Sequence, residues 1–263
     1  MGLIQRVLQN ADERRKRILS GKVNCIPSPF NCFRYDFPGT ELGTYYLISG
    51  GAKSSKSKLT NFLFLFNSIL YAYYHPDLVK LKIFYALLEE KAENITGKFI
   101  CFLLYKLSGG KIRIDIKTFK SVDEGRILSA EILEMLNTLE YQSILRFYEE
   151  HVDFIPDRNP TGIYHTLEKY AEANGTIHRK KVEGYDKEVF DYYEPNNPDE
   201  YVMCIVDHIG LISTERGMDL RNSIKKLSEY LKIVRNKYNY IPVVVQQQNS
   251  ESLSLEAFKA NKI

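Results

Sequence analysis

Residues 45–60 read YYLISGGAKSSKSKLT, and the fold of the chain can be argued outward from this stretch. A short apolar run suited to a β-strand, Tyr45 to Ile48, leads into a turn of small residues, Ser49 to Ser55. Lys56 and Ser57 follow, and then a long apolar run of helical character. Strand, small-residue loop, Lys-Ser and helix is the layout of a phosphate-binding P-loop. In that motif backbone N–H groups and the helix N-terminus face an anion, and the lysine adds a full positive charge.

The match to the pattern G-x-x-x-x-G-K-[ST] lacks one glycine. Gly50 takes the first glycine position, but Ser55 takes the second, where glycine permits backbone torsions that other residues disfavour. The alternative interpretation is a solvated loop rich in Lys and Ser. We predict a nucleotide-binding loop made of Gly50, Gly51, Ala52, Lys53, Ser54, Ser55, Lys56 and Ser57.

Length and composition are those of an ordinary globular α/β chain. The 263 residues suit one large domain or two small ones, and 44% are hydrophobic and 26% charged. A net charge of +3 is too small to indicate nucleic-acid binding by overall charge, so any basic patch must be local. No apolar segment at the N-terminus reads as a signal peptide, and the longest apolar stretch, residues 62–74, is too short to span a bilayer. We therefore expect a cytoplasmic protein.

The cysteines give no metal or disulfide pattern. No C-x-x-C pair occurs, and Cys101 and Cys204 lie inside apolar runs, where cysteine acts as a small core residue. Cys25 and Cys32 lie in a loop without two further ligands nearby. A chain with reduced thiols is the simple interpretation.

Apolar runs and helical patterns alternate along the chain. Strands are predicted at residues 45–48, 82–88, 152–155, 201–206 and 241–245. Helices are predicted at residues 2–20, 56–74, 92–107, within 121–150, 160–173 and 219–238. The strands are continuously apolar, which predicts an α/β fold with a mostly parallel sheet covered by helices on both faces. Residues 175–200 are charged and turn-rich, and we expect a surface insertion or hairpin there.

Polar residues follow several of these strands. In a parallel sheet, ligands bind beyond the carboxyl ends of the strands. Glu89 follows the second strand, Asp207 ends the fourth and Gln247 follows the fifth. Together with the P-loop, they predict a nucleotide site at one edge of the sheet.

Each of these residues suits one part of phosphoryl transfer. Lys56 would hold the β- and γ-phosphates, and Ser57 and Asp207 would serve Mg²⁺. Glu89 would orient or deprotonate the attacking water, with Glu90 as the competitor, and both could instead be first-turn helix charges. Gln247 could hydrogen-bond the γ-phosphate, and Gln246 could equally face the site.

The motifs, in this order, resemble the RecA-fold motor domain of DnaB-type replicative DNA helicases, particularly phage-encoded versions. The stretch ISGGAKSSKS is similar to the family's P-loop, and IFYALLEE to its strand ending in Ser-Leu-Glu-Met. The stretch CIVDHIGLI is similar to its Walker B segment, and QQQN to its Ser-Gln-Leu-Asn. The resemblance spans about Arg14 to Asn249 and implies a RecA-like P-loop NTPase.

The resemblance implies an ATP hydrolase that uses ATP and Mg²⁺ and translocates on single-stranded DNA. It assigns Glu89 as catalytic, with Lys56 and Gln247, and Asp207 as metal-associated. It also implies a DNA-binding loop at Ser213 to Arg221, with Arg216 and Arg221 as its basic residues. A homo-oligomeric ring is implied, expected as a hexamer, with primase as a further partner to consider and no membrane.

In domain terms, residues 1–21 correspond to an amphipathic linker helix that docks onto the next subunit; packing on the chain's own core is the alternative. Residues 22–263 correspond to the ATPase domain. The stretch 250–263 contains no arginine, so we expect the family's C-terminal strands and arginine finger to be absent. Two other functions stay open: a RecA/RadA-like recombination or repair ATPase that forms filaments, and a non-catalytic scaffold derived from such an ATPase.

Overall fold

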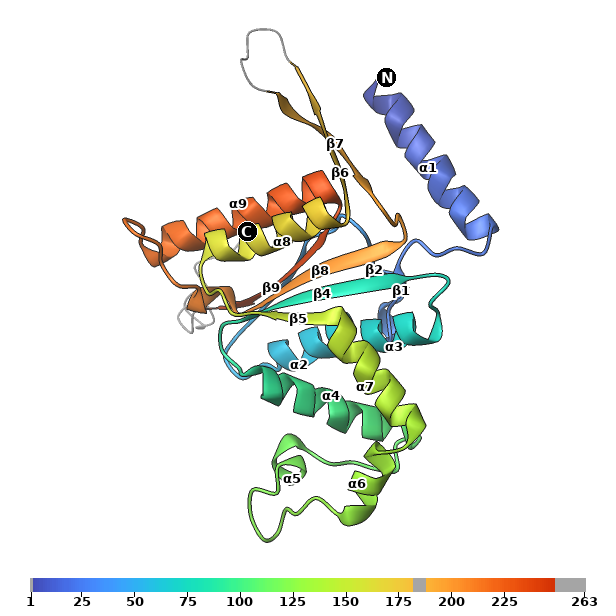
Figure 1. Ribbon diagram of the computed structural model, residues 1–263, viewed down its shortest axis with the longest axis vertical. Coiled ribbons are helices and arrows are strands. Elements are labelled where there is room, and N and C mark those ends of the chain that lie inside the picture. Colours follow the sequence, from blue (N-terminus) through green and yellow to red (C-terminus); the bar gives the residue numbers. More distant parts are fainter. Residues whose placement is uncertain (1, 182–187, 249–263) are drawn as a thin grey trace, which may run out of the picture.

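The computed structural model describes residues 2–181 and 188–248 of the chain. Within these residues, one five-stranded sheet forms the centre of the molecule, and all of its neighbouring strands pair in parallel (Figure 1). Across the sheet the strands are β3 (Tyr46–Gly50), β9 (Ile241–Gln247), β8 (Glu200–Asp207), β4 (Lys80–Leu87) and β5 (Val152–Ile155). The predicted α/β fold with a parallel sheet is confirmed.

The register of the sheet aligns the carboxyl ends of its strands. Along β4 and β8 the pairing runs to Leu87 opposite Asp207. Along β3 and β9 it runs to Gly50 opposite Gln247. The P-loop, the end of β8 and the end of β9 therefore open onto the same edge.

One face of the sheet is covered by the helix that follows the P-loop and by two later helices. The first runs without a break from Lys56 to Tyr74 as α2 (Lys56–Thr60), a π-helical stretch (Asn61–Phe66) and α3 (Asn67–Tyr74). It packs beside α4 (Ala92–Leu107) and α7 (Leu139–His151) (Figure 1). The core of this layer contains the buried side chains of Phe64, Ile69, Phe99, Leu103, Ile144, Ile83 and Met203.

The other face is covered by α8 (Pro160–Ala173) and α9 (Leu220–Tyr238) (Figure 1). Asn159 caps α8 by accepting from the N–H of Gly162 at 2.9 Å, and proline at the first helical position suits that start. Asp219 caps α9 in the same way. Leu227 and Leu231 of α9 are buried against this face, as their helical spacing predicts.

The remaining elements are short or peripheral. Two antiparallel pairs lie outside the central sheet: β1 (Ile26–Pro27) with β2 (Gly39–Thr40), and β6 (Gly175–Lys180) with β7 (Val189–Pro195). The β6–β7 pair, which belongs to the charged segment 175–200, projects away from the sheet (Figure 1). Helices α5 (Ile116–Phe119) and α6 (Ala130–Leu136) and two 3-10 turns (Asn31–Phe33 and Ile209–Leu211) complete the structure.

Helix α1 (Leu3–Leu19) lies apart from the core. It has no buried residue, and Leu3, Ile4, Val7 and Leu8 expose more than half of their surface. The alternative that this apolar stripe packs on the chain's own core is therefore wrong.

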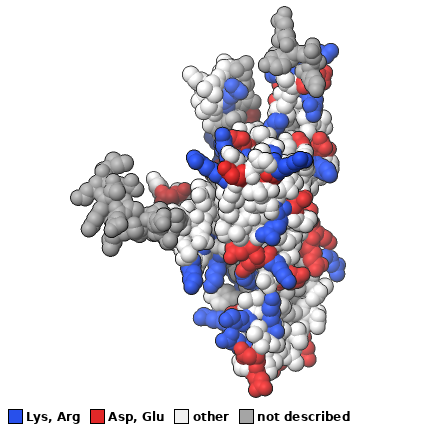
Figure 2. Space-filling view, turned by 90° about the vertical axis from the view of Figure 1, so that its left-hand side faces the viewer, with Lys and Arg blue, Asp and Glu red and all other residues white. Residues whose placement is uncertain are grey.

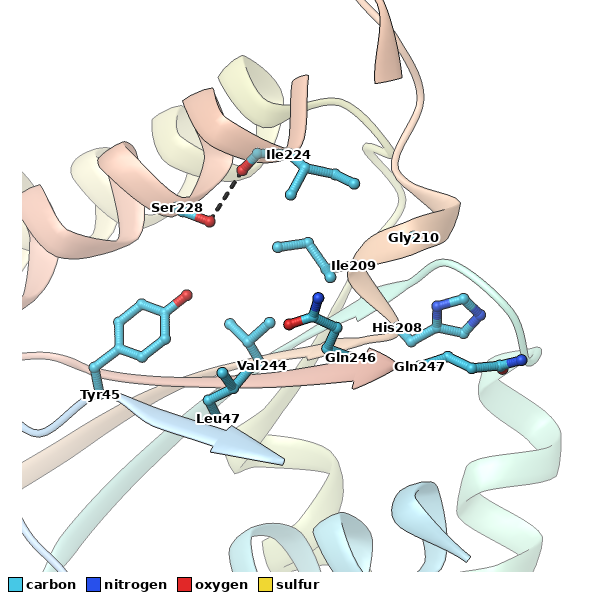
Figure 3. A pocket seen from close by; sticks show the side chains of 10 residues that line it. All are labelled: Tyr45, Leu47, His208, Ile209, Gly210, Ile224, Ser228, Val244, Gln246 and Gln247. Carbon is cyan, nitrogen blue, oxygen red and sulfur yellow. Dashed lines mark hydrogen bonds between the residues drawn. The ribbon is translucent and has the colours of Figure 1, made fainter. Parts of the chain in front are cut away.

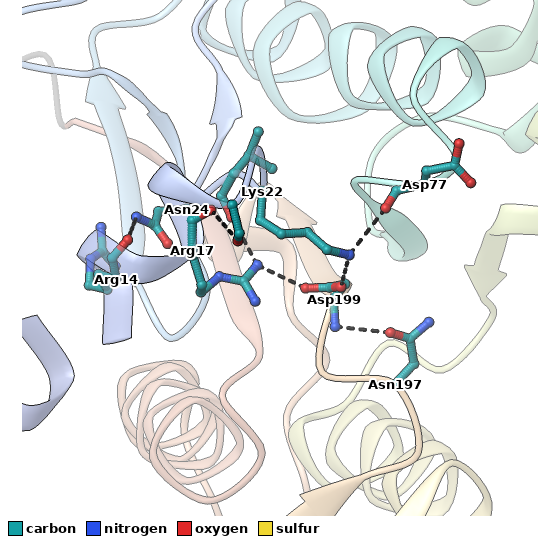
Figure 4. Close-up of polar contacts among 9 residues, drawn as sticks. Arg14, Arg17, Lys22, Asn24, Asp77, Asn197 and Asp199 are labelled. Atoms are coloured by element: carbon teal, nitrogen blue, oxygen red, sulfur yellow. Dashed lines mark hydrogen bonds and ion pairs between the residues drawn. The ribbon is translucent and has the colours of Figure 1, made fainter. Parts of the chain in front are cut away.

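The C-terminal end of α1 is fixed to the domain by charge (Figure 4). Arg17 and Lys22 each pair with Asp199, both at 2.8 Å, and Arg14 pairs with Glu41 at 2.7 Å. Burial of Asp199 opposes ionisation, but hydrogen bonds from Lys22 and Arg17 outweigh it and hold the pKa of that carboxyl below its ordinary value. We call Arg17, Lys22 and Asp199 the α1 clamp.

Two expectations about composition are also answered. Cys101 and Cys204 are buried free thiols, and burial raises the pKa of Cys204 to about 12. Across the described chain, no helix has the length and apolar character needed to cross a membrane.

Candidate nucleotide site

A pocket of about 400 Å³ lies at the edge where the carboxyl ends of the strands meet. Its walls come from the P-loop, from the turn after β4 and from the ends of β8 and β9. Figure 2 views the molecule from this side, where acidic and basic side chains lie next to one another. The pocket brings together the predicted residues Lys53, Ser54, Ser55, Lys56, Ser57, Glu89, Asp207 and Gln247.

The P-loop keeps a glycine-like backbone although its second glycine is a serine. Ser55 has φ 63° and ψ 24°, in the left-handed region, and it directly precedes α2. Lys53 also has a positive φ, 58°. A side chain in this region costs roughly 1–2 kcal/mol, so Ser55 holds the loop geometry at the expense of stability.

Inside the loop, the carbonyl of Gly51 accepts two side-chain hydrogen bonds. The ammonium of Lys56 donates to it, and the hydroxyl of Ser54 donates at 2.8 Å. Gly50 lies so close to Ser54 that an added Cβ would meet the serine Oγ at 2.8 Å. The loop thus curls around the Lys56 ammonium and holds one positive charge at the start of α2.

Asp207 is a buried carboxylate at the end of β8, with 7% of its surface exposed. Tyr85 donates to its Oδ2 at 3.4 Å, while Oδ1 is buried without a hydrogen-bond partner among the described residues. Burial raises the pKa of Asp207, the nearby Ser57 hydroxyl lowers it in part, and the nearby charge of Glu89 raises it further.

An unpartnered carboxylate oxygen beside a serine hydroxyl fits a hard divalent cation. Magnesium in nucleotide sites is held by one or two protein oxygens and the phosphates, with water for the rest. No three His, Cys, Asp or Glu side chains of the described residues gather into a metal site of their own. Asp207 and Ser57 are the residues that fit Mg²⁺.

The two glutamates after β4 differ in their surroundings. Glu90 is held by both carboxylate oxygens on the ammonium of Lys98, a residue of α4. Both glutamates line the pocket, but Glu89 is exposed and has no ion pair within the described chain. Of the two, Glu89 is therefore the carboxylate without a charged partner among the described residues.

The two glutamines at the end of β9 differ in the pockets that they line. Gln247 lines the P-loop pocket, next to the ladder pair that it forms with Gly50. Gln246 points toward α9, into a second pocket of about 250 Å³ lined by Tyr45 and Ser228 among others (Figure 3). His208 and Gln247 line both pockets, and His208 follows a cis peptide bond after Asp207.

Arg216 and Arg221 lie outside the pocket. Both are exposed, Arg216 in the loop between the 3-10 turn at Ile209–Leu211 and α9, and Arg221 in the first turn of α9. Neither forms an ion pair with another described residue. They offer two free positive charges at the entrance to α9.

Three residues that touch the site were missed by the sequence analysis. Tyr85 reaches Asp207 across the sheet, Lys98 neutralises Glu90, and Arg158 donates to the carbonyl of Leu88. For Lys98 a signal existed, since a residue two helical turns beyond the β4–α4 turn returns to the same face. For Arg158 no local pattern could indicate the contact.

Comparisons with known proteins support the fold. No family model matches the chain, and no curated protein matches it. Among solved structures it is similar to a DnaB-like replicative helicase, studied together with its interactions with primase. That match has a TM-score of 0.58 at 14% identity and covers 96% of this chain and 50% of the other. The chain thus spans about half the length of that helicase, and the shared feature is the RecA-like fold.

Proposed function

We propose that this chain is an ATP-binding and ATP-hydrolysing motor domain of the DnaB-like helicase type. The observation that carries the proposal is the meeting of Lys56, Ser57, Glu89, Asp207 and Gln247 in one pocket of a RecA-like fold. A volume of about 400 Å³ lies within the range of small-molecule sites.

In the proposed site, the triphosphate occupies the curl of the P-loop. Its oxygens take the place of the Gly51 carbonyl as partners of the Lys56 ammonium. Ser57 and Asp207 would hold Mg²⁺, which would neutralise phosphate charge. The buried oxygen of Asp207 that has no partner among the described residues would then have a ligand to bind.

Hydrolysis is attack of water on the γ-phosphorus. Glu89 orients the water and accepts its proton, the bond from the γ-phosphorus to the bridging oxygen breaks, and ADP leaves with that oxygen. Glu90 takes no part because Lys98 already neutralises it. Gln247 donates to the γ-phosphate. Because Gln247 lies at the end of β9, loss of that phosphate changes the position of the residues that follow it.

One exposed surface supports DNA binding, and another supports assembly of several copies of the chain. Arg216 and Arg221 carry free positive charge for a phosphate backbone. The exposed apolar stripe of α1, held away from its own core by the α1 clamp, is suited to dock onto a neighbouring copy in a ring. Primase, a partner of the similar helicase, is a binding partner to test.

The test is steady-state hydrolysis of Mg-ATP with and without single-stranded oligo-dT. We expect DNA to stimulate turnover of the natural chain. Glu89→Gln should lower kcat by about 10²–10⁴-fold, the range for loss of a general base, while Glu90→Gln stays within about twofold.

Other outcomes point to the other functions. If Glu90→Gln, and not Glu89→Gln, abolishes turnover, the assignment of the base is reversed. Open helical filaments in electron micrographs would favour a recombination or repair ATPase. Nucleotide binding without any hydrolysis would favour a scaffold.

A further inference from the structure

The loop that carries Arg216 is tied to the end of β4 through Arg158. Arg158 lies in the turn between β5 and α8. Its guanidinium donates to the carbonyl of Leu88, the residue directly before Glu89. Its own carbonyl accepts from the N–H of Ser213 at 2.6 Å. One residue therefore contacts the support of the proposed base and the start of the proposed DNA loop.

A second contact joins the same two turns. Glu215 accepts from the N–H of Thr161 at 2.8 Å and pairs with Lys226 of α9. Thr161 lies in the first turn of α8, three residues after Arg158. The start of the loop and the turn before α8 are thus fastened at two points, and displacement of one displaces the other.

The turn that holds Glu89 lies beyond the sheet ladder and has three supports: the buried side chain of Leu88, the pair of Glu90 with Lys98, and Arg158. The β4–β8 ladder ends at Leu87, opposite Asp207, so Leu88 lies beyond the last ladder pair. Glu89 itself is exposed toward the pocket. Among the described residues, the guanidinium of Arg158 is the side-chain group that hydrogen-bonds the peptide preceding Glu89.

We infer that Arg158 is a positioning residue that couples the Ser213–Arg221 loop to the carboxylate of Glu89. The inference rests on the proposed function, because the roles of Glu89 and of the loop are proposed. A phosphate backbone bound at Arg216 and Arg221 shifts Ser213, Arg158 follows, and the Leu88 carbonyl moves the glutamate relative to the attacking water. Displacement of a catalytic group by about 1 Å can change a rate on the order of 10²-fold, so a small shift is sufficient.

The test breaks the link at the end far from Glu89. Ser213→Pro removes the N–H that donates to Arg158, and Ile212 already has the extended conformation, φ −61° and ψ 136°, that a residue before proline adopts. Ser213→Gly keeps the N–H and is the matched control. Amide hydrogen exchange of residues 88–91 is measured on the full chain without nucleotide.

We expect faster exchange at residues 88–91 in Ser213→Pro and in Arg158→Ala, and no change in Ser213→Gly. The double variant should exchange no faster than Arg158→Ala, because both changes break one link. Wild-type exchange in Ser213→Pro, or additive effects in the double variant, would overturn the inference. If Ser213→Pro fails to fold, the comparison of Arg158→Ala with Arg158→Lys, which can still donate to Leu88, decides it.

Turnover gives the functional readout. Arg158→Ala should lower kcat on the order of tenfold with KM for Mg-ATP unchanged, and Arg158→Lys should recover most of the loss. A rise in KM with unchanged kcat would assign Arg158 to nucleotide binding and contradict the inference. Arg126→Ala, at an exposed arginine outside the site, is the control. Absence of hydrolysis in the wild type would count against the proposed function alone, since the exchange experiment needs no nucleotide.

Discussion

At the scale of single residues, the site is a set of charges whose partners decide their roles. Lys98 neutralises Glu90, whereas Glu89 has no such partner within the described chain, and Asp207 keeps one buried oxygen unpartnered. Position along the chain cannot separate two adjacent glutamates. Their contacts with other elements separate them.

Ser55 gives a direct test of strain in the P-loop. Glycine adopts its left-handed torsions without the side-chain penalty, so Ser55→Gly should raise the free energy of unfolding by about 1 kcal/mol. Urea denaturation measures it. Ser54→Gly is the control, because it removes the bond to the Gly51 carbonyl and should destabilise. Destabilisation by Ser55→Gly would show that the serine side chain supports the loop.

Asp207 predicts a pH dependence of stability. Burial raises its pKa, so the folded chain keeps the proton at a pH where the unfolded chain has released it. Stability from this group is full below the ordinary pKa and is lost as pH rises through the raised value. Asp207→Asn should therefore be more stable than wild type at pH 7, with the difference vanishing in acid. Equal denaturation midpoints for Asp207→Asn and wild type, both at pH 7 and in acid, would contradict this.

The sequence predicts which residues follow the strands, and therefore which residues lie near the site. Apolar runs followed by Glu89, Asp207 and Gln247 indicated a common edge, and these residues line one pocket. The choice between Gln246 and Gln247 needed the register of β9 against β3. The contact of Arg158 with Leu88 joins residues 70 positions apart, and no periodic pattern records such a contact.

At the scale of elements, periodicity predicted the helices and strands closely. The helix from Lys56 to Tyr74 and the strand at Val152–Ile155 lie where the sequence indicated. The order of strands across the sheet could not be read from the sequence, because it depends on how crossover helices distribute between the two faces. The place of α1 also needed the structure, since an apolar stripe does not say what covers it.

Helix α1 predicts a specific effect on self-association. Val7 is 58% exposed on the apolar stripe, so Val7→Asp should leave the stability of the chain within about 0.5 kcal/mol of wild type. It should abolish self-association, because a charge would be buried at the contact with a second copy. Sedimentation velocity measures the outcome, with Asn10→Asp as the control on the same helix. Unchanged association of Val7→Asp would exclude this stripe from the interface.

At the scale of the whole molecule, the proposed nucleotide site, the proposed DNA contact and the proposed self-association surface lie on different parts of the chain. The sheet edge gathers the proposed nucleotide site, and Arg216 and Arg221 are exposed in the loop before α9 and in its first turn. The α1 clamp joins the domain to the C-terminal end of a helix that lies apart from the core (Figures 1 and 4). The similarity in fold to the DnaB-like helicase covers 96% of the chain. Residues 249–263, on which the expected absence of an arginine finger rests, lie outside the described residues.

The most direct measurement is calorimetric titration of the full chain with Mg-ATP. The pocket predicts one site per chain in the wild type. Lys56→Ala should weaken binding on the order of a hundredfold, because the charged hydrogen bonds to the phosphates are lost. Lys232→Ala, an exposed lysine of α9, should bind as the wild type does. Equal affinity of Lys56→Ala and wild type for Mg-ATP would contradict the assignment of the nucleotide site.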